Sequence, residues 1–279
     1  MKIPFTKMHG LGNDFVILDL TERKIELSPE KICELADRNF GIGFDQQLQI
    51  ESASSPEVDF DYRIFNTDGT EVEHCGNGAR CFATFVREKN LSNQNPLKVR
   101  TINRILSLQV TGNGDVSVDM GAPEFNPISI PFKTDIEDIV YTRELEIEGK
   151  NREFEFIPLS MGNPHAVICV EDLANTAVKD IGEALGNHPD FPSGVNVGFM
   201  QIISKEQIKL RVFERGTGET LACGTGACAA VVAGRLLNRL NNNVKVGLTG
   251  GNLDIRWEKG SSVVMTGPTK IVYEGTIDL

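Results

Sequence analysis

A short cysteine–glycine turn occurs twice in this chain, and an apolar helical pattern follows each copy. The first copy reads CGNGA and starts at Cys75, and the second reads CGTGA and starts at Cys223. The two cysteines lie 223 − 75 = 148 positions apart in a chain of 279 residues. Repetition at a fixed interval is the sequence signature of repeated structural units. The duplication therefore predicts two halves with similar structures.

Further polar landmarks recur in the same order at almost the same interval. The matched pairs are Gly12-Asn13 with Gly162-Asn163 (163 − 13 = 150), Gln46 with Asn196 (196 − 46 = 150), and Asn66 with Glu214 (214 − 66 = 148). A single short match arises easily by chance, whereas four in register do not. We therefore expect two facing halves related by a pseudo-twofold axis, joined near the Pro-rich stretch within 121–150.

The rest of the pattern alternates many short strands with few helices, which is typical of an α/β or α+β fold. Residues 58–64 alternate apolar and charged side chains, as in a strand with one buried face. We expect hairpins over 105–121, 145–157 and 253–265, and another strand over 206–214. A helix should begin after Ser28 and stop near Gly41. Two more helices should begin just after the repeated cysteines.

The composition excludes several classes of partner. Hydrophobic residues make up 40% of the chain and charged residues 24%, which is ordinary for a globular protein. The net charge is −11 and no basic run is present, so neither nucleic acid nor an anionic membrane is an expected partner. The first residues show no signal-peptide pattern, and no apolar run is long enough for a membrane helix. A cytoplasmic protein with a small-molecule substrate is therefore expected.

The repeated turn suits binding of anions and activation of a thiol. Its glycines let backbone N–H groups approach a ligand closely, and the first N–H groups of a helix lack partners within the helix. The helix dipole adds partial positive charge, which favours an anion and also a cysteine thiolate. Two such turns facing one ligand would place a base on one side of a carbon and an acid on the other. Their titrations should then be coupled.

The cysteines could instead pack in the core or bind a metal. Cys33 and Cys169 lie among apolar residues and are expected to pack in the core, as are Cys81 and Cys228 inside the two helices. Four or five residues separate the cysteines of each close pair, which does not match the short double pairs of a zinc ribbon. No metal site is therefore expected.

Several polar residues gain meaning from their places in the repeat. Arg215 could clamp a carboxylate in bidentate fashion, although an isolated Glu-Arg pair is more often a surface ion pair. Four asparagines occupy turns that the repeat matches, and we expect them to hydrogen-bond a small polar substrate; they are Asn13, Asn66, Asn163 and Asn196. His165 could tune a nearby thiol or serve the structure alone.

The motifs together resemble those of the diaminopimelate epimerase family. The stretches that carry the resemblance are KMHGLGNDF (7–15), GIGFDQ (41–46), YRIFNTDG (62–69), CGNGARC (75–81), SMGNPH (160–165), VNVGFMQI (195–202), ERGTGET (214–220) and CGTGACAA (223–230). They run in order through most of the chain. The resemblance implies interconversion of LL- and meso-diaminopimelate, an isomerisation in lysine and peptidoglycan-precursor synthesis, without pyridoxal phosphate or metal.

The same resemblance implies roles, a fold and an assembly. Cys75 and Cys223 would be the proton-transferring pair, assisted by His165 and Glu214. The substrate-binding residues would be Asn13, Gln46, Asn66, Gly76, Asn77, Asn163, Asn196, Glu214, Arg215, Gly224 and Thr225. Each half would be a mostly antiparallel or mixed sheet around a central helix, with residues 1–121 and 266–279 in one half and 122–265 in the other. Homodimers are common in the family.

One local departure and three alternatives remain open. Gln47 and Gln49 stand where the family often has apolar residues, which affects packing beside Gln46 more than chemistry. The nearest alternative is a related two-cysteine racemase or epimerase of proline-type amino acids. A non-catalytic binder of small amino acids would use the same anion sites, and a thiol-redox or zinc protein would use the cysteines.

Overall fold

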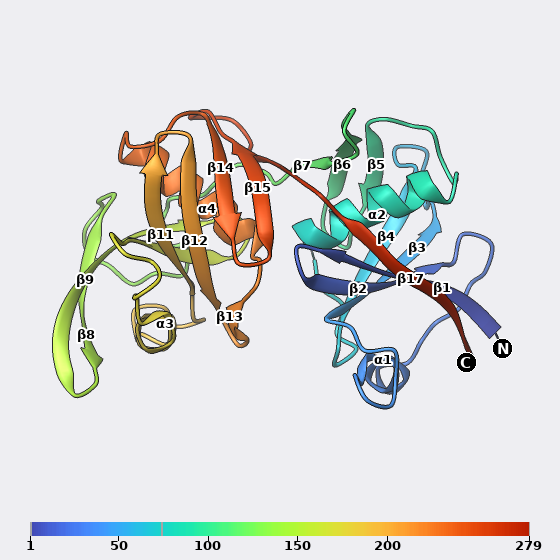
Figure 1. The fold of residues 1–279 in the computed structure, drawn as a ribbon, viewed down its shortest axis with the longest axis horizontal. Helices are drawn as coiled ribbons and strands as arrows, with labels where there is room; N and C mark the ends of the chain where they lie inside the picture. Colours follow the sequence, from blue (N-terminus) through green and yellow to red (C-terminus); the bar gives the residue numbers. More distant parts are fainter. Residues whose placement is uncertain (1, 74, 279) are drawn as a thin grey trace. The chain divides into compact units, whose positions relative to one another are not determined.

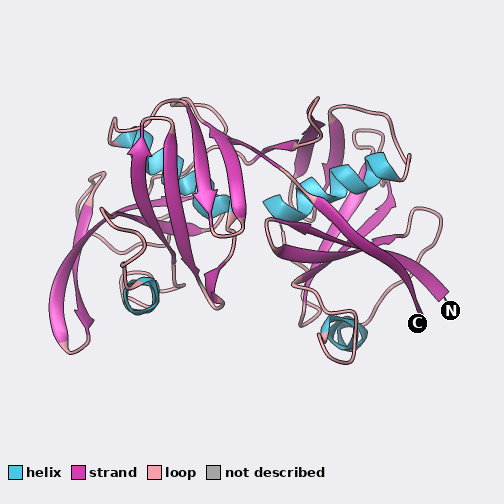
Figure 2. Ribbon diagram, in the orientation of Figure 1, coloured by secondary structure: helices cyan, strands magenta, loops and turns pink. Residues whose placement is uncertain are grey.

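The computed structural model describes residues 2–73 and 75–278, and the chain separates into two compact units. Unit 1 comprises Met1–Asp119 and Thr266–Leu279, and unit 2 comprises Met120–Met265. Figure 1 labels most elements of both units, and Figure 2 shows that strands dominate in each. The fold is therefore a mixed-sheet α+β fold with few helices, as the sequence predicted.

The two units share a core succession of two strands, a helix, two strands, a second helix and two strands, to which each unit adds strands of its own. Unit 1 holds β1 (Lys2–Gly10), β2 (Asn13–Asp19), α1 (Pro29–Ala36), β3 (Gln46–Ser52), β4 (Phe60–Asn66), α2 (Gly76–Glu88), β5 (Leu97–Arg100), β6 (Ile105–Val110), β7 (Val116–Asp119) and β17 (Lys270–Asp278). Unit 2 holds β8 (Tyr141–Ile147), β9 (Lys150–Ser160), β10 (Pro164–Cys169), α3 (Val178–Gly186), β11 (Asn196–Ser204), β12 (Gln207–Glu214), β13 (Gly218–Thr220), α4 (Gly224–Leu236), β14 (Asn243–Leu248) and β15 (Gly251–Arg256). Strand β16 (Val264–Gly267) leads from unit 2 into unit 1.

The strand pairing repeats residue by residue between the units. Strands β2 and β3 are parallel, as are β10 and β11, and the next pair in each unit is antiparallel. Gln47 pairs with Phe65 in unit 1, and Val197 pairs with Phe213 in unit 2. These partners follow the intervals of 150 and 148 residues seen in the sequence. The internal repeat is therefore real at the level of backbone register.

A helix is enclosed by strands in each unit. Helix α2 contacts β1, β2, β3, β6 and β7, and α4 contacts β9, β10, β11, β12 and β15. Most of each helix is buried, and in α4 every residue over 226–234 is buried. A helix that is apolar on all sides belongs in a core. The expected sheet around a central helix is thus confirmed.

Helices α1 and α3 cover the other face of their sheets. Ile32 and Leu35 of α1 pack in one cluster with Val16 and Leu18 of β2. The corresponding cluster in unit 2 joins α3 to β10 and β11. The sheet of each unit therefore lies between a short outer helix and a buried central one.

Some expectations about the helices and cysteines were wrong. Helix α1 ends at Ala36 rather than near Gly41, because the Asp37 carboxylate accepts the N–H groups of Asn39 and Phe40 in a turn. Helix α3 was not predicted. Cys33 is exposed because only the opposite side of α1 packs on the sheet.

The other cysteines and strands followed the sequence more closely. Cys81 and Cys228 are fully buried, whereas Cys169 is only partly buried. The hairpins expected over 105–121 and 145–157 are present as β6–β7 and β8–β9. In the third expected hairpin, the chain turns after β15, but the backbone of Val263 exchanges hydrogen bonds with Met120 and Gly121. No helix of the described residues is long and apolar enough to span a membrane.

Candidate functional site

The polar landmarks of unit 1 meet at one end of its sheet. Asn13 begins β2 and Gln46 begins the parallel strand β3, while Asn66 ends the antiparallel strand β4. Strands β2 and β3 are parallel and start together, and the antiparallel strand β4 ends beside them. All three residues therefore lie at the same edge of the sheet. Gln46 donates from Nε2 to Oδ1 of Asn66 at 3.0 Å. The structure therefore brings these predicted site residues together.

Cys75 caps the buried helix α2 at this edge. Its Sγ accepts the N–H of Gly78 at 3.4 Å, and its thiol donates to Oδ1 of Asn13 at 3.8 Å. The Nδ2 group of Asn77 also donates to Oδ1 of Asn13, at 3.1 Å. The Asn13 oxygen thus lies against both the sulfur and the first turn of the helix. The cysteine is partly exposed, whereas Asn77 is buried.

A tight backbone turn places Asn13 in this position. Leu11 and Gly12 join β1 to β2 with φ values of 58° and 91°. The matching residue Gly162 has φ 90° and precedes Asn163 in the same way. Positive φ is easily adopted by glycine and rarely by other residues. The two Gly-Asn sequences are therefore conformational equivalents.

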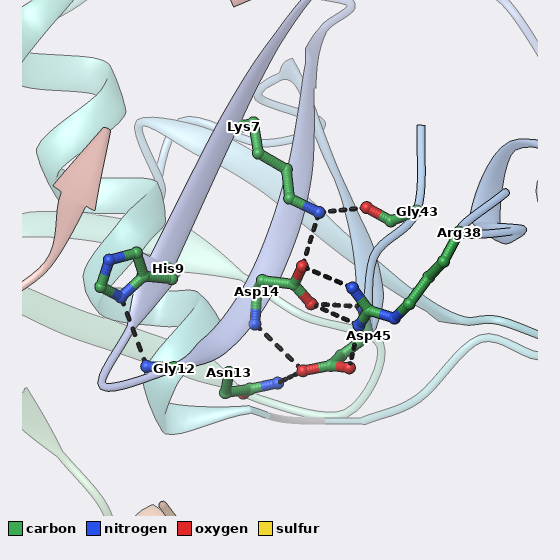
Figure 3. Close-up of polar contacts among 8 residues, drawn as sticks. All are labelled: Lys7, His9, Gly12, Asn13, Asp14, Arg38, Gly43 and Asp45. Atoms are coloured by element: carbon green, nitrogen blue, oxygen red, sulfur yellow. Dashed lines mark hydrogen bonds and ion pairs between the residues drawn. The ribbon is translucent and has the colours of Figure 1, made fainter. Parts of the chain in front are cut away.

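Four charged residues form a network that contacts the Asn13 side chain through Asp45 (Figure 3). Asn13 donates from Nδ2 to Oδ2 of Asp45 at 2.9 Å, and the same oxygen accepts the N–H of Asp14. Arg38 binds both carboxylates, and the buried Lys7 binds Asp14 and the carbonyl of Gly43. Burial opposes ionisation of Asp14, but hydrogen bonds from Arg38 and Lys7 outweigh it and lower its pKa to about 2.

The landmarks of unit 2 meet at the equivalent sheet edge. Asn163 precedes β10, Asn196 begins the parallel strand β11, and Glu214 ends the antiparallel strand β12. Cys223 then occupies the N-cap position of the buried helix α4, as Cys75 does in α2, but only the Cys75 side chain makes a capping hydrogen bond. The two sets of candidate residues therefore occupy matching places in the two units.

The surroundings of Cys223 keep its proton on the sulfur. Its thiol donates to Oε2 of Glu214 at 3.2 Å, and Thr225 Oγ1 lies 3.6 Å from the sulfur. The other Glu214 oxygen accepts the hydroxyl of Thr220. Burial raises the pKa of the Cys223 thiol well above its usual value, and the charge of Glu214 raises it further. Cys223 is therefore a thiol at neutral pH.

His165 contacts Asn163 rather than a cysteine. Its Nε2 lies 3.0 Å from Oδ1 of Asn163, whose Nδ2 donates to Oγ1 of Thr225 at 3.3 Å. Burial, together with the charge of Arg215, lowers the pKa of His165 to about 3. The imidazole is thus neutral, and it is connected to Cys223 through the Asn163 and Thr225 side chains.

The side chains of Asn196 and Arg215 hydrogen-bond to backbone groups in this structure. Asn196 accepts the N–H of Arg215 at 2.9 Å and donates to the carbonyl of Pro164 at 3.1 Å. The Arg215 guanidinium donates to the carbonyl of Ser193 at 2.8 Å, and the residue is exposed. Arg215 must therefore exchange this contact if it is to clamp a carboxylate.

Sequence reasoning missed the polar residues that support Asn13. Lys7, Asp14, Arg38 and Asp45 all lie within or near quoted motifs, yet nothing in their spacing shows that they form one network next to Asn13. Arg80, inside the first cysteine helix, was also missed; it is fully buried and donates to Oδ1 of Asn77 at 3.0 Å. A charged residue inside an otherwise apolar helix that follows a candidate site is the signal that sequence alone offers.

The departure at Gln47 and Gln49 also has a structural outcome. Both side chains are buried on the face of β3 that turns away from Leu48. Within the described residues, both polar atoms of the Gln47 amide and the Gln49 oxygen lack hydrogen-bond partners. Among residues 2–73 and 75–278, no cluster of three or more His, Cys, Asp or Glu side chains is arranged to hold a metal ion.

Solved structures define the class of fold to which this arrangement belongs. A phenazine biosynthesis protein of the PhzF family from Bacillus anthracis superposes with a TM-score of 0.68 at 18% identity, with full coverage of both chains. A hydroxyproline epimerase from Agrobacterium vitis gives 0.68 at 14% identity, covering 99% of this chain and 92% of that one. The chain thus has the two-domain fold shared by these proteins.

Sequence similarity then places the chain within one family. The sequence pattern of the family described as diaminopimelate epimerase matches residues 5–126 and 158–272. A protein named diaminopimelate epimerase from Teredinibacter turnerae (strain ATCC 39867 / T7901) is 51% identical over 280 residues, with full coverage of both chains. This chain belongs to the diaminopimelate epimerase family.

Proposed function

We propose that this protein interconverts LL- and meso-diaminopimelate by moving a proton between opposite faces of one α-carbon. The observation that carries the proposal is the pair of cysteines at matching helix N-termini, each among matching polar residues. Family membership supports diaminopimelate as the substrate. The two units would be the two epimerase halves, one carrying Cys75 and the other Cys223.

In one direction of the reaction, Cys223 would supply the proton. Its contact with Glu214 and its raised pKa keep it protonated. Cys75, as thiolate, would take the α-proton from the opposite face, forming an S–H bond as the C–H bond breaks. The electron pair would pass into the adjacent carboxylate and return to the carbon as Cys223 gives up its proton. The reverse direction exchanges the two roles.

The helix N-termini would hold the reacting carboxylate. The first N–H groups of α2 and α4 lack partners within the helix, and the glycines leave room for close approach. Negative charge that develops on the carboxylate in the transition state would then meet fixed N–H donors. Asn13, Gln46, Asn66, Gly76 and Asn77 would bind substrate from unit 1. From unit 2 the binding residues would be Asn163, Asn196, Glu214, Arg215, Gly224 and Thr225.

Proton NMR of LL-diaminopimelate in D₂O tests the proposal directly. Purified, reduced enzyme without added cofactor should remove the α-proton signal and yield deuterated meso product. An unchanged spectrum with folded protein would overturn the assignment. Proline-type substrates would be tried next, and ligand binding without exchange would identify a non-catalytic binder.

The proposal requires the two sulfurs to face one substrate, which oxidation can test. Cysteines form a disulfide only when their Cα atoms come within about 7 Å of each other. Mild oxidation should link Cys75 to Cys223 and abolish activity, and reduction should restore it. Oxidised enzyme that stays fully active, or failure to recover activity on reduction, would contradict the facing arrangement.

The remaining family properties are part of the same proposal. We expect catalysis without pyridoxal phosphate or metal, since the carboxylate itself accepts the electron pair. Activity should therefore survive dialysis against a chelator and treatment with a carbonyl-trapping reagent. A homodimer is proposed on the family resemblance, and light scattering of the purified protein tests the assembly.

A further inference from the structure

We propose that Asp45 and Arg80 are positioning residues that fix which end of the Asn13 amide faces Cys75. Their role in catalysis rests on the function proposed above, whereas the orientation itself rests on geometry alone. Four side chains form a single chain of hydrogen bonds in unit 1. Arg80 donates to Asn77 at 3.0 Å, Asn77 to Asn13 at 3.1 Å, and Asn13 to Asp45 at 2.9 Å.

The two ends of this chain allow only one direction. An arginine guanidinium donates hydrogen bonds and cannot accept them, while an ionised carboxylate accepts and cannot donate. Arg80 therefore requires the oxygen of Asn77 on its side, which turns the Asn77 amide N–H₂ toward Asn13. Asp45 requires the N–H₂ of Asn13 on the opposite side. Both ends agree, so the Asn13 oxygen must point toward Asn77 and Cys75.

Asp45 is itself held firmly enough to act as an anchor. Its Oδ2 also accepts the N–H of Asp14 at 3.0 Å, and its Oδ1 accepts from Arg38 at 2.7 Å. Its own N–H donates to Oδ1 of Asp14 at 2.9 Å. These reciprocal contacts (Figure 3) fix the carboxylate relative to the start of β2.

The corresponding positions of unit 2 hold residues that cannot exert this directional control. By the repeat intervals, Asp45 corresponds to Val195 (195 − 45 = 150) and Arg80 corresponds to Cys228 (228 − 80 = 148). Asn163 lies instead between His165 and Thr225, an imidazole and a hydroxyl that can each donate or accept. The one-way chain is therefore specific to the unit that carries Cys75.

The orientation matters because it sets the partner of the Cys75 proton. The Asn13 oxygen accepts from the thiol at 3.8 Å, so it favours the protonated sulfur and makes the thiolate a stronger base. Tyr62 on β4 and Cys81 on α2 also interact electrostatically with Cys75, and Arg80 lies on the same helix. Substitution of Asp45 leaves all three in place.

Alkylation of Cys75 by iodoacetamide, followed by mass spectrometry across pH, tests the inference without relying on turnover. In Asp45→Ala the Asn13 N–H₂ group loses its acceptor, so Asn77 alone still holds the amide oxygen and the amide is held less firmly toward the sulfur. The pH of half-maximal alkylation should fall by about half a unit or more. The turnover number for α-proton exchange should fall about tenfold, with a smaller change in KM.

Two further variants are controls: one removes the charge of Asp45 but keeps an acceptor oxygen, and the other changes a distant carboxylate. Asp45→Asn removes the charge but keeps an oxygen that can accept from Asn13, so it should retain the wild-type alkylation profile and most of the turnover. Asp172→Ala removes an exposed carboxylate that accepts backbone N–H groups in unit 2, and it should change neither readout. Circular dichroism and Tm would confirm that each variant is folded.

The outcomes distinguish the inference from the proposed function. Equal shifts in Asp45→Ala and Asp45→Asn would show that charge alone acts, and a wild-type profile in Asp45→Ala would show that Asp45 does not orient Asn13; either overturns the inference. The expected alkylation shifts in a protein without α-proton exchange would support the orientation and overturn the epimerase function. α-Proton exchange without an alkylation shift in Asp45→Ala would support the epimerase function and overturn the orientation.

Discussion

The Cys75 and Cys223 turns share a backbone but differ in what faces the sulfur. Each cysteine caps a buried helix at the edge of a sheet, and each follows a strand with the same pairing. The Cys75 thiol meets the amide oxygen of Asn13, whereas the Cys223 thiol meets the carboxylate of Glu214. One duplicated scaffold therefore places its two thiols against different acceptors, a neutral amide and a carboxylate.

The support behind each turn differs as well. Unit 1 places Lys7, Asp14, Arg38 and Asp45 behind Asn13, and the matching asparagine of unit 2 meets the neutral His165. Repetition of the backbone thus does not require repetition of the charges. A two-base enzyme gains from this difference, because one sulfur must be charged while the other carries a proton.

Loss of either thiol should have the largest effect on the rate of epimerisation. Cys75→Ala and Cys223→Ala should each lower epimerisation by about 10²–10⁴-fold, the usual worth of a positioned acid or base. Rates with LL and meso substrate, measured by NMR, check this. Wild-type turnover in either variant would remove that cysteine from the mechanism.

Removal of the Glu214 charge should make the two sulfurs more alike. In Glu214→Gln the pKa of the Cys223 thiol should fall, because the charge goes, but stay above its usual value, because burial remains. Cys223 should then alkylate at lower pH, and turnover should fall about 10–100-fold. Glu219→Gln, which breaks an ion pair with Arg211 on the same hairpin, is the matched control and should keep the wild-type profile.

The charged support in unit 1 should contribute to stability in a pH-dependent way. The folded pKa of Asp14 is about 2 against an ordinary value of 3.8, so its stabilisation is present above 3.8 and lost as pH falls through 2. Asp14→Asn should lower the free energy of unfolding by about 2 kcal/mol at pH 7. Urea titrations should show the difference from wild type shrinking toward pH 2. A constant difference across this range would contradict the sign of the linkage.

The positive-φ turn that the two units share should have a smaller effect on stability, which acts through the backbone alone. Gly162 has φ 90°, and the space that an alanine methyl group would occupy there has no atom within 4 Å. Gly162→Ala should therefore cost about 1–2 kcal/mol through the left-handed backbone alone. Gly112 has equal space without positive φ, and Gly112→Ala should cost nothing measurable by urea unfolding. Equal stabilities of the two variants would show that the turn can relax.

Much of the fold followed from local pattern. The duplicated cysteine turn, the matched landmarks and the alternating strands predicted two similar α+β halves, each with a helix after its cysteine. Hydrophobic periodicity and glycine turns act over a few residues, so they are visible in the chain itself. The burial of Cys81 and Cys228 followed for the same reason, since both lie one turn inside an apolar helix.

Burial against distant segments was decided by the tertiary structure. Cys33 was expected inside and lies outside, because the packing of α1 on its sheet determines which side of a short helix is covered. Gln47 and Gln49 are polar in sequence and buried in the fold, because both faces of β3 are covered. Side-chain polarity alone does not reveal how many layers cover a strand.

In the candidate site, too, some features followed from the sequence and others only from the tertiary structure. The sequence by itself determined which candidate residues of the two halves correspond, because a repeat in register marks equivalent positions without any knowledge of contacts. Only the tertiary structure decided what faces each of them: an amide for one thiol, a carboxylate for the other, and Asp45 and Arg80 at the ends of one hydrogen-bond chain. Hydrogen bonds depend on distance and direction between segments far apart in the chain, and neither is written in residue spacing.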